Sequence, residues 1–99
     1  MRLVYTDQAR MRLRDIFDYY SFRVSKKIAR SIIQEIKEKS KSLTSQSFIG
    51  QEEEFLAHLN LGHRYLVAGN YKIIYRRDKE YIYIVDIFDT RQNPDKMKG

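Results

Sequence analysis

Apolar residues in the first half of the chain recur three or four positions apart, the spacing of an amphipathic helix. The first stripe consists of Ala9, Leu13, Ile16, Phe17 and Tyr20. Thr6 can cap the start of this helix, and Asp7 places negative charge against the helix dipole. A second stripe, which begins near Ser25, consists of Ala29, Ile32, Ile33, Ile36 and Leu43. The two stripes predict an antiparallel helical hairpin.

After Gly62 the pattern changes to the alternation that is typical of strands. We expect strands at residues 63–67, 71–76 and 81–88, with a tight turn at Gly69 and Asn70 because glycine accepts a positive φ. Residues 77–80 form a polar turn. The middle strand places Tyr71, Ile73 and Tyr75 on one face and Lys72, Ile74 and Arg76 on the other. The last strand is apolar on nearly both faces, which predicts a central position.

The remaining segments complete a β-α-α-β-β-β order. Residues 2–5 predict a short initial strand, and the polar, serine-rich residues 39–51 predict a loop. Residues 51–61 fit either a helical turn or an irregular edge strand. We therefore predict a single α+β domain over residues 1–99, with an N-terminal strand, a two-helix antiparallel hairpin and a three-stranded antiparallel meander. A short tail is expected from about residue 92.

Composition adds a charge bias to this picture. Nineteen Lys and Arg against thirteen Asp and Glu leave a net charge of +6 in 99 residues. Such a charge attracts nucleic acid, a ribosome or an acidic protein, although many basic domains bind no polyanion. The chain has no cysteine and no apolar run near the roughly 20 residues of a membrane span, and its start does not resemble a signal peptide. We expect a cytoplasmic protein without a membrane partner.

Several short stretches resemble the RelE/ParE family of bacterial toxins. Arg64 to Tyr75, read as Arg-Tyr-Leu-Val-Ala-Gly-Asn-Tyr-Lys-Ile-Ile-Tyr, is similar to the second and third strands of that family. Ile82 to Val85, followed by Phe88 to Pro94, is similar to the closing segment of the ParE-like branch. The short first strand, Thr6 and the helix after it also fit. The resemblance covers Leu3 to Pro94 and implies the toxin of a type II toxin–antitoxin module, as in plasmid stabilisation.

The resemblance implies one of two activities. RelE-like members cut messenger RNA on the ribosome without a metal, whereas ParE-like members inhibit DNA gyrase. Lys72 and Arg91 match basic active-site positions of the RelE-like nucleases, and Arg64 matches a basic position of the ParE pattern. We take Arg64, Lys72, Arg76 and Arg91 as candidate target-binding or nucleic-acid-binding residues. In a nuclease, Lys72, Arg91 and Arg64 would be the catalytic candidates.

Those cations are expected to converge if the last strand lies antiparallel beside residues 71–76. Arg64 and Lys72 lie on adjacent strands across a tight hairpin, and Arg91 directly follows the last strand. The alternative is that they are solvated charges, or that they form ion pairs with Glu52, Glu53 or Glu54.

Ribonuclease chemistry also needs groups that accept and donate protons. The tail after Arg91 has no Tyr or His, which many RelE-like enzymes carry there. His63 is the one nearby substitute, and alternation places it on the face opposite Arg64, which favours a structural role. Asp86 and Asp89 face opposite ways on their strand and make no carboxylate dyad. The sequence thus favours gyrase inhibition over RNA cleavage, and a degenerate toxin that only binds its antitoxin as a co-repressor is a third reading.

We expect neither a metal nor a cofactor. His58 and His63 are five residues apart without a metal-binding motif, and no glycine-rich phosphate loop is present. The resemblance implies a cognate antitoxin as partner, and operator DNA only through that antitoxin. The basic helix positions Lys26, Lys27, Arg30 and Lys37 are candidates for steering the antitoxin, the alternative being ordinary solubility.

Overall fold

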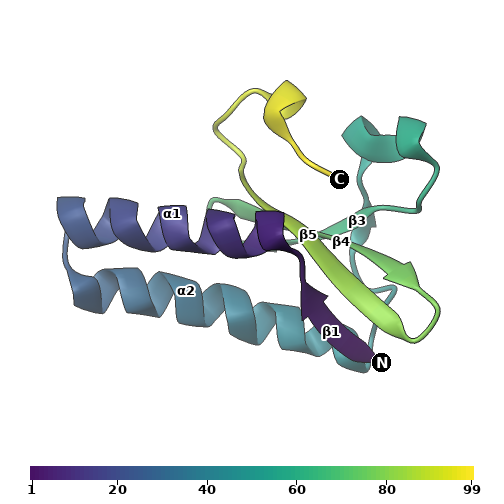
Figure 1. Cartoon of the computed structure of the whole chain (residues 1–99), viewed down its shortest axis with the longest axis horizontal. Coiled ribbons are helices and arrows are strands. Elements are labelled where there is room, and N and C mark those ends of the chain that lie inside the picture. Colours follow the sequence, from purple (N-terminus) through teal and green to yellow (C-terminus); the bar gives the residue numbers. More distant parts are fainter.

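The computed structural model describes residues 1–99 as helices packed on one face of a mixed sheet (Figure 1). The helices are α1 (Asp7–Arg23) and α2 (Lys26–Lys41). The strands are β1 (Arg2–Tyr5), β2 (Gln51–Glu52), β3 (Arg64–Ala68), β4 (Tyr71–Asp78) and β5 (Tyr81–Asp89). Three short 3₁₀ helices are η1 (Ser42–Thr44), η2 (Glu54–Leu59) and η3 (Pro94–Lys96). No helix is both long and apolar enough to cross a membrane.

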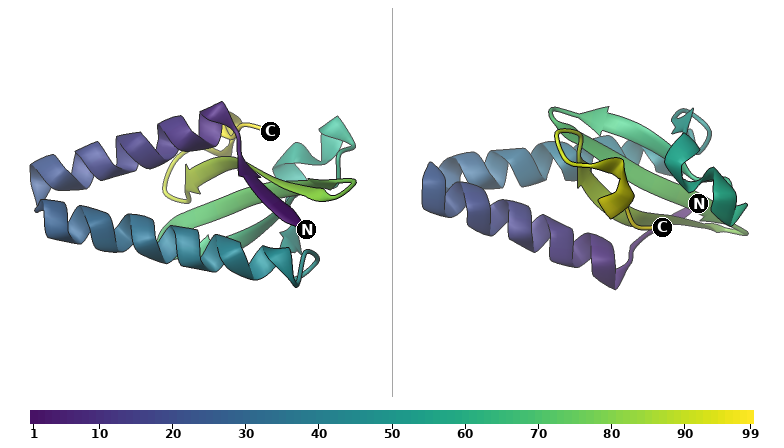
Figure 2. Two further views of the ribbon diagram at one scale, coloured as in Figure 1. Left: turned by 60° about the horizontal axis from the view of Figure 1, so that its bottom comes forward. Right: turned by 90° about the horizontal axis from the view of Figure 1, so that it is seen from above.

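The sheet has the strand order β1-β5-β4-β3-β2, which makes β5 and β4 central. β1 lies parallel to β5, and the other neighbouring strands pair antiparallel. The predicted α+β fold is confirmed: an initial strand, an antiparallel helical hairpin and an antiparallel meander. Figure 2 shows the hairpin crossing one face of the sheet and projecting beyond it at one end.

Both helices begin where the sequence predicts. The Thr6 Oγ1 atom accepts a hydrogen bond from the Ala9 backbone N–H at 3.2 Å, and it donates to the Ile84 carbonyl at 3.1 Å. Ser25 Oγ accepts from the Ile28 N–H at 3.1 Å. Each cap satisfies a backbone donor that has no partner within the helix. Thr6 additionally ties the start of α1 to the central strand.

The main core lies between the helices and the sheet. Ala9, Leu13 and Ile16 of α1 and Ile36 of α2 are buried there against strand residues that include Tyr71, Ile73, Tyr75, Ile82 and Ile84. These are the predicted stripes and the predicted face of the middle strand. Leu43, after the end of α2, is also fully buried in this core.

A bulge in β5 changes which of its residues face the helices. Ile74 pairs with Asp86 but Tyr75 pairs with Ile84, so Val85 is an extra residue in the ladder. As a result Ile87 joins Ile84 in the main core, although strict alternation would separate them.

The opposite face of the sheet carries a second, smaller core. Leu56 of η2 and Met97 of the C-terminal tail pack there with Ile74, Val85 and Phe88. The tail is held by a hydrogen bond from the Lys98 N–H to the Asp86 carboxylate at 2.9 Å. The tail after residue 92 is thus folded onto the sheet.

Element boundaries differ from the expected ones by a few residues. β4 continues to Asp78 because the hairpin needs only two turn residues, and Lys79 supplies the left-handed conformation with φ of 57°. β3 begins at Arg64 rather than at residue 63, and α2 runs to Lys41 into the expected loop. Residues 51–61 contain both alternatives: a two-residue edge strand, β2, followed by η2.

Candidate functional site

The register of the sheet places Arg64 and Lys72 on opposite faces. Arg64 pairs with Tyr75, which points into the main core under the helices. Lys72 pairs with Phe88, which belongs to the smaller core on the other side. Since paired residues in a ladder project to the same face, the two cations cannot meet across the sheet. Arg76 lies on the Lys72 side, where it pairs with Tyr83.

Arg64 holds the loop before β2 against the sheet. Its Nη1 donates to the Gly50 carbonyl at 2.7 Å, and its Nη2 lies 3.9 Å from the Glu52 carboxylate. The Gly50 N–H donates to the Tyr75 hydroxyl at 3.0 Å. A side chain at Gly50 would meet the Tyr65 carbonyl at 2.6 Å, so this close approach requires glycine.

Lys72 is paired with a buried carboxylate. Its Nζ donates to Glu53 Oε2 at 2.9 Å and lies 4.1 Å from the centre of the Tyr65 ring. Glu53 is almost fully buried, and its other oxygen accepts from the Phe55 N–H at the start of η2. Lys72 therefore neutralises the buried carboxylate that caps η2. The pairs Arg64–Glu52 and Lys72–Glu53 are the ion pairs that the sequence analysis gave as the alternative to target binding.

Arg76 stacks on an aromatic ring. Its guanidinium lies 4.8 Å from the centre of the Tyr83 ring and 4.0 Å from the Asp78 carboxylate. Its Nε is buried without a hydrogen-bond partner.

Arg91 lies beyond the end of β5 and forms a two-pronged ion pair with Asp89. The Arg91 Nε and Nη2 atoms lie 3.0 and 2.8 Å from the two Asp89 oxygens. This pair raises the pKa of Arg91 and holds the pKa of the Asp89 carboxyl below its ordinary value. Lys72 and Arg91 both lie near the Tyr71 end of the hairpin, but Arg91 belongs to a cavity on the α1 side.

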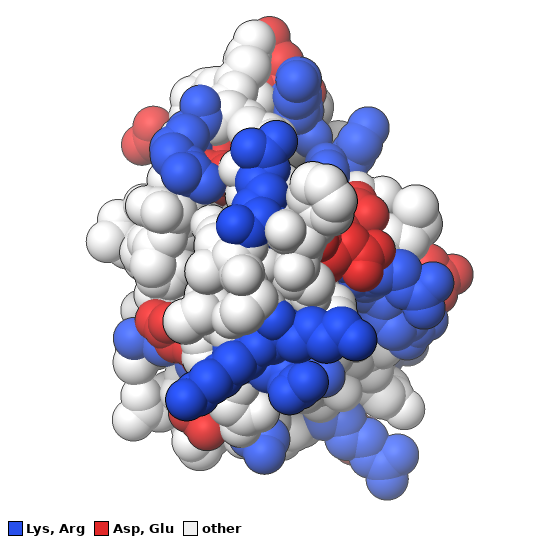
Figure 3. Space-filling view, turned by 90° about the vertical axis from the view of Figure 1, so that its left-hand side faces the viewer, with Lys and Arg blue, Asp and Glu red and all other residues white.

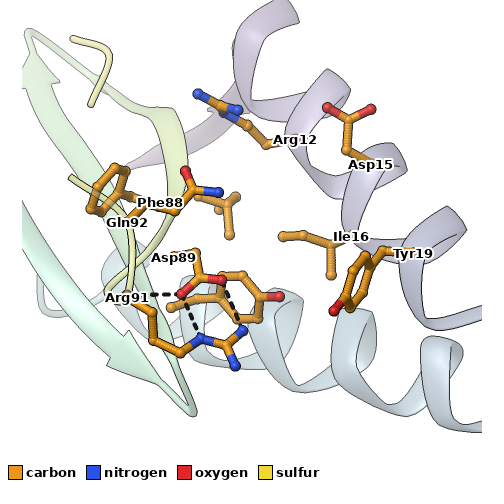
Figure 4. Close-up of a pocket in the computed structure, with 10 residues that line it drawn as sticks. Arg12, Asp15, Ile16, Tyr19, Phe88, Asp89, Arg91 and Gln92 are labelled. Carbon is orange, nitrogen blue, oxygen red and sulfur yellow. Dashed lines mark hydrogen bonds and ion pairs between the residues drawn. The ribbon is translucent and has the colours of Figure 1, made fainter. Parts of the chain in front are cut away.

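That cavity, of about 310 Å³, lies between α1 and the end of β5 (Figure 4). Its walls are formed by Arg12, Asp15, Ile16, Tyr19, Tyr71, Ile87, Phe88, Asp89, Arg91 and Gln92. In Figure 4, Arg12, Asp15 and Tyr19 lie on α1, across the cavity from Asp89 at the end of β5 and from Arg91 just after it. Burial raises the pKa of the Tyr71 hydroxyl, and the neighbouring Tyr20 raises it further. Half of the residues that line the cavity are apolar or aromatic and half are charged or polar, which suits an amphipathic segment of a protein.

A buried ion pair that the sequence analysis did not anticipate borders this cavity. Arg12 Nε donates to Asp86 Oδ1 at 3.1 Å, and the Lys98 N–H donates to the second oxygen of the same carboxylate. Asp86 is fully buried in the central strand. The only sequence signal was an acidic residue inside an otherwise apolar strand.

His63 packs against the C-terminal residue. Its Nε2 lies 3.4 Å from the Gly99 carbonyl, and its buried Nδ1 has no hydrogen-bond partner. Burial lowers the pKa of His63, so the imidazole is neutral in the folded protein at neutral pH. No group of three potential metal ligands is present.

The basic positions of the helices have a different environment from Arg64, Lys72, Arg76 and Arg91. Lys26, Lys27, Arg30 and Lys37 are exposed and none lies within 4.0 Å of a carboxylate. Figure 3 looks at the end of the molecule where the helices project, and it shows Lys and Arg side chains beside uncharged surface.

Comparison with known proteins identifies the class. The helical hairpin on a mixed sheet is shared with a solved structure titled a chromosomal ParDE toxin–antitoxin system from P. aeruginosa. That structure is 25% identical in sequence and superposes with a TM-score of 0.75 over 88% of this chain and 92% of the other. No curated protein matches. The family model for the ParE toxin of the type II toxin–antitoxin system parDE matches residues 3–94. The chain therefore belongs to the ParE family of type II toxin–antitoxin toxins.

The ion pair of Lys72 predicts a loss of stability that a second substitution recovers. Lys72→Met keeps the aliphatic stem over Tyr65 but leaves Glu53 buried without its partner, so we expect unfolding free energy to fall by about 1–3 kcal/mol. Adding Glu53→Gln removes the buried charge, and at least half of the loss is expected to return in denaturant titrations. Lys96→Met, at an exposed lysine, serves as the control. This role would be contradicted if the double variant lost more unfolding free energy than the two single variants lose together.

The buried His63 predicts weaker folding at acidic pH. Its pKa is lowered in the folded state, so below the ordinary value of about 6.5 the unfolded chain binds the proton more readily. This contribution is present above pH 7 and is lost as the pH falls toward 5. We expect His63→Gln to flatten the decline of stability over that range. His58→Gln, at an exposed histidine, should leave the decline unchanged; equal slopes for all three proteins would exclude the effect.

Proposed function

We propose that this toxin inhibits DNA gyrase and is neutralised by a cognate antitoxin. We choose gyrase over RNA because of where the candidate nuclease residues lie and which carboxylates they contact. Lys72 and Arg64 project from opposite faces of the sheet, and Lys72 and Arg91 are each engaged by a carboxylate. Cleavage of RNA through its 2′-hydroxyl would need cations and proton carriers gathered around one phosphate. The geometry supports a protein that binds its target.

Two assays on the purified toxin test this proposal. We expect inhibition of gyrase supercoiling together with trapping of the gyrase–DNA cleavage complex, and no cutting of messenger RNA on programmed ribosomes. Cutting in the second assay alone would replace the proposal with the nuclease reading. Activity in neither assay, with intact antitoxin binding, would leave the co-repressor reading.

We propose that the antitoxin docks over the cavity between α1 and β5 and is steered by the basic helix positions. The apolar floor formed by Ile16, Tyr71 and Ile87 suits the apolar side of an amphipathic segment that folds on binding. The unpaired cations of α2 attract an acidic chain from a distance. By family analogy, the toxin would reach operator DNA only through the antitoxin.

This steering predicts a salt-dependent association rate. Between low salt and about 0.5 M salt we expect the on-rate for the antitoxin to fall by about tenfold or more, because exposed charges are screened. Changing Lys26, Lys27, Arg30 and Lys37 to Gln should reduce that dependence in stopped-flow measurements. The control replaces Lys79, Lys96 and Lys98, which lie away from α2. An on-rate indifferent to salt would remove the electrostatic part of the proposal.

A further inference from the structure

The end of the helical hairpin exposes a group of apolar side chains that contributes little to either core. Phe22 is 90% exposed and Val24 is 60% exposed, and Tyr19 and Ile28 are also exposed beside them. We call these four residues and the cations among them, Arg23, Lys26, Lys27 and Arg30, the hairpin tip. The tip lies at the end of α1 and α2 that projects beyond the sheet (Figures 1 and 2).

Positive charge surrounds these apolar side chains without compensation. Residues 19–34 contain four basic residues and no acidic one. Arg23 lies 4.8 Å from the centre of the Tyr19 ring, and no carboxylate lies within 4.0 Å of any of the four cations. Arg64, Lys72 and Arg76 of the sheet, by contrast, lie within 4.0 Å of a carboxylate, whereas Arg2 and Arg77 do not. The hairpin tip therefore combines four uncompensated cations with exposed apolar side chains.

Folding explains Arg23, because the helix dipole favours a cation in the last turn of α1, but it does not explain Lys26, Lys27 or Phe22. Lys26 and Lys27 occupy the first turn of α2, where the helix dipole favours negative charge and no acidic residue is present. An exposed Phe22 buries almost no surface in the folded chain. Both features are unfavourable or neutral for the isolated domain, whereas an apolar centre with a charged rim is the usual anatomy of a protein–protein interface.

We propose that the hairpin tip is the surface by which the toxin contacts its target, and that the contact is with an acidic protein surface of gyrase. This inference rests on the proposed function. Phe22 and Val24 enter an apolar depression of the target, and the four cations face carboxylates around it. A protein surface fits better than duplex DNA because the phosphate backbone offers nothing to the most exposed apolar side chain of the chain.

The same arrangement accounts for neutralisation. An antitoxin attracted by Lys26, Lys27 and Arg30 would engage charges that the target also needs. The bound antitoxin would then compete with gyrase for these cations and so block its access to the hairpin tip. The antitoxin's affinity would still come from the cavity between α1 and the end of β5, which adjoins the hairpin tip at Tyr19.

The decisive variant is Phe22→Ser with Val24→Ser. Both side chains are exposed, so the thermal unfolding midpoint should stay close to that of the unmodified toxin. We expect the concentration that half-maximally traps the gyrase–DNA cleavage complex to rise by about tenfold or more, as for central interface residues. The matched control is Phe55→Ser with Leu61→Ser, exposed apolar residues near η2, which should change it by less than about twofold.

Lys26→Gln with Lys27→Gln tests the charged rim. We expect weaker trapping at low salt and a difference that shrinks as salt is added. Binding of each variant to a free linear DNA duplex is measured in parallel. If the lysine variant loses DNA binding while Phe22→Ser with Val24→Ser traps gyrase like the unmodified toxin, the tip serves DNA and the inference is overturned.

The outcomes of these experiments distinguish a failure of this inference from a failure of the proposed gyrase inhibition. If the unmodified toxin traps no cleavage complex, the proposed function fails and the inference fails with it. If the unmodified toxin is active and the Phe22 and Val24 variant is equally active, only the inference fails. The inference is supported if the Phe22 and Val24 variant folds normally but loses trapping, while the Phe55 and Leu61 control stays active.

Discussion

Strand β5 is buried on both faces, and the rest of the chain is arranged to cover it. The helical hairpin lies over one face, and η2 with the C-terminal tail lies over the other. β1 and β4 pair with its two edges. A central strand has no solvent to satisfy its backbone groups, so each edge needs a partner strand and each face needs an apolar layer. A domain of 99 residues can supply both layers only if even its tail is used.

Burying this strand also brings a charge into the interior. Asp86 is fully buried, and it is satisfied by Arg12 from α1 and by the backbone N–H of Lys98. Glu53 and Lys72 form an equivalent arrangement at the start of η2. An unpaired buried charge is strongly unfavourable, so each of these carboxylates has recruited a cation from a neighbouring element. Lys72, which the sequence offered for an anionic target, is thereby committed to folding.

Arg64, Lys72 and Arg76 of the sheet are paired with carboxylates, whereas the four cations of the hairpin tip are not. The projecting end of α1 and α2 combines uncompensated cations with exposed apolar side chains, and it is the part of the molecule least constrained by the core. If the hairpin tip contacts the target, as we propose, stability and target contact depend on different residues.

The sequence alone determined the helical hairpin, the caps at Thr6 and Ser25, the turn at Gly69 and the family, because these depend on local periodicity and on residue types at short spacing. It also determined which residues of β4 share a face. Only the tertiary structure decided the side of the sheet on which each cation lies, the bulge at Val85 and the partners of Glu53 and Asp86. Strand register and ion pairing depend on residues far apart in the chain, and a shift of one residue moves a side chain to the opposite face. Alternation within one strand cannot show which distant carboxylate a lysine will meet.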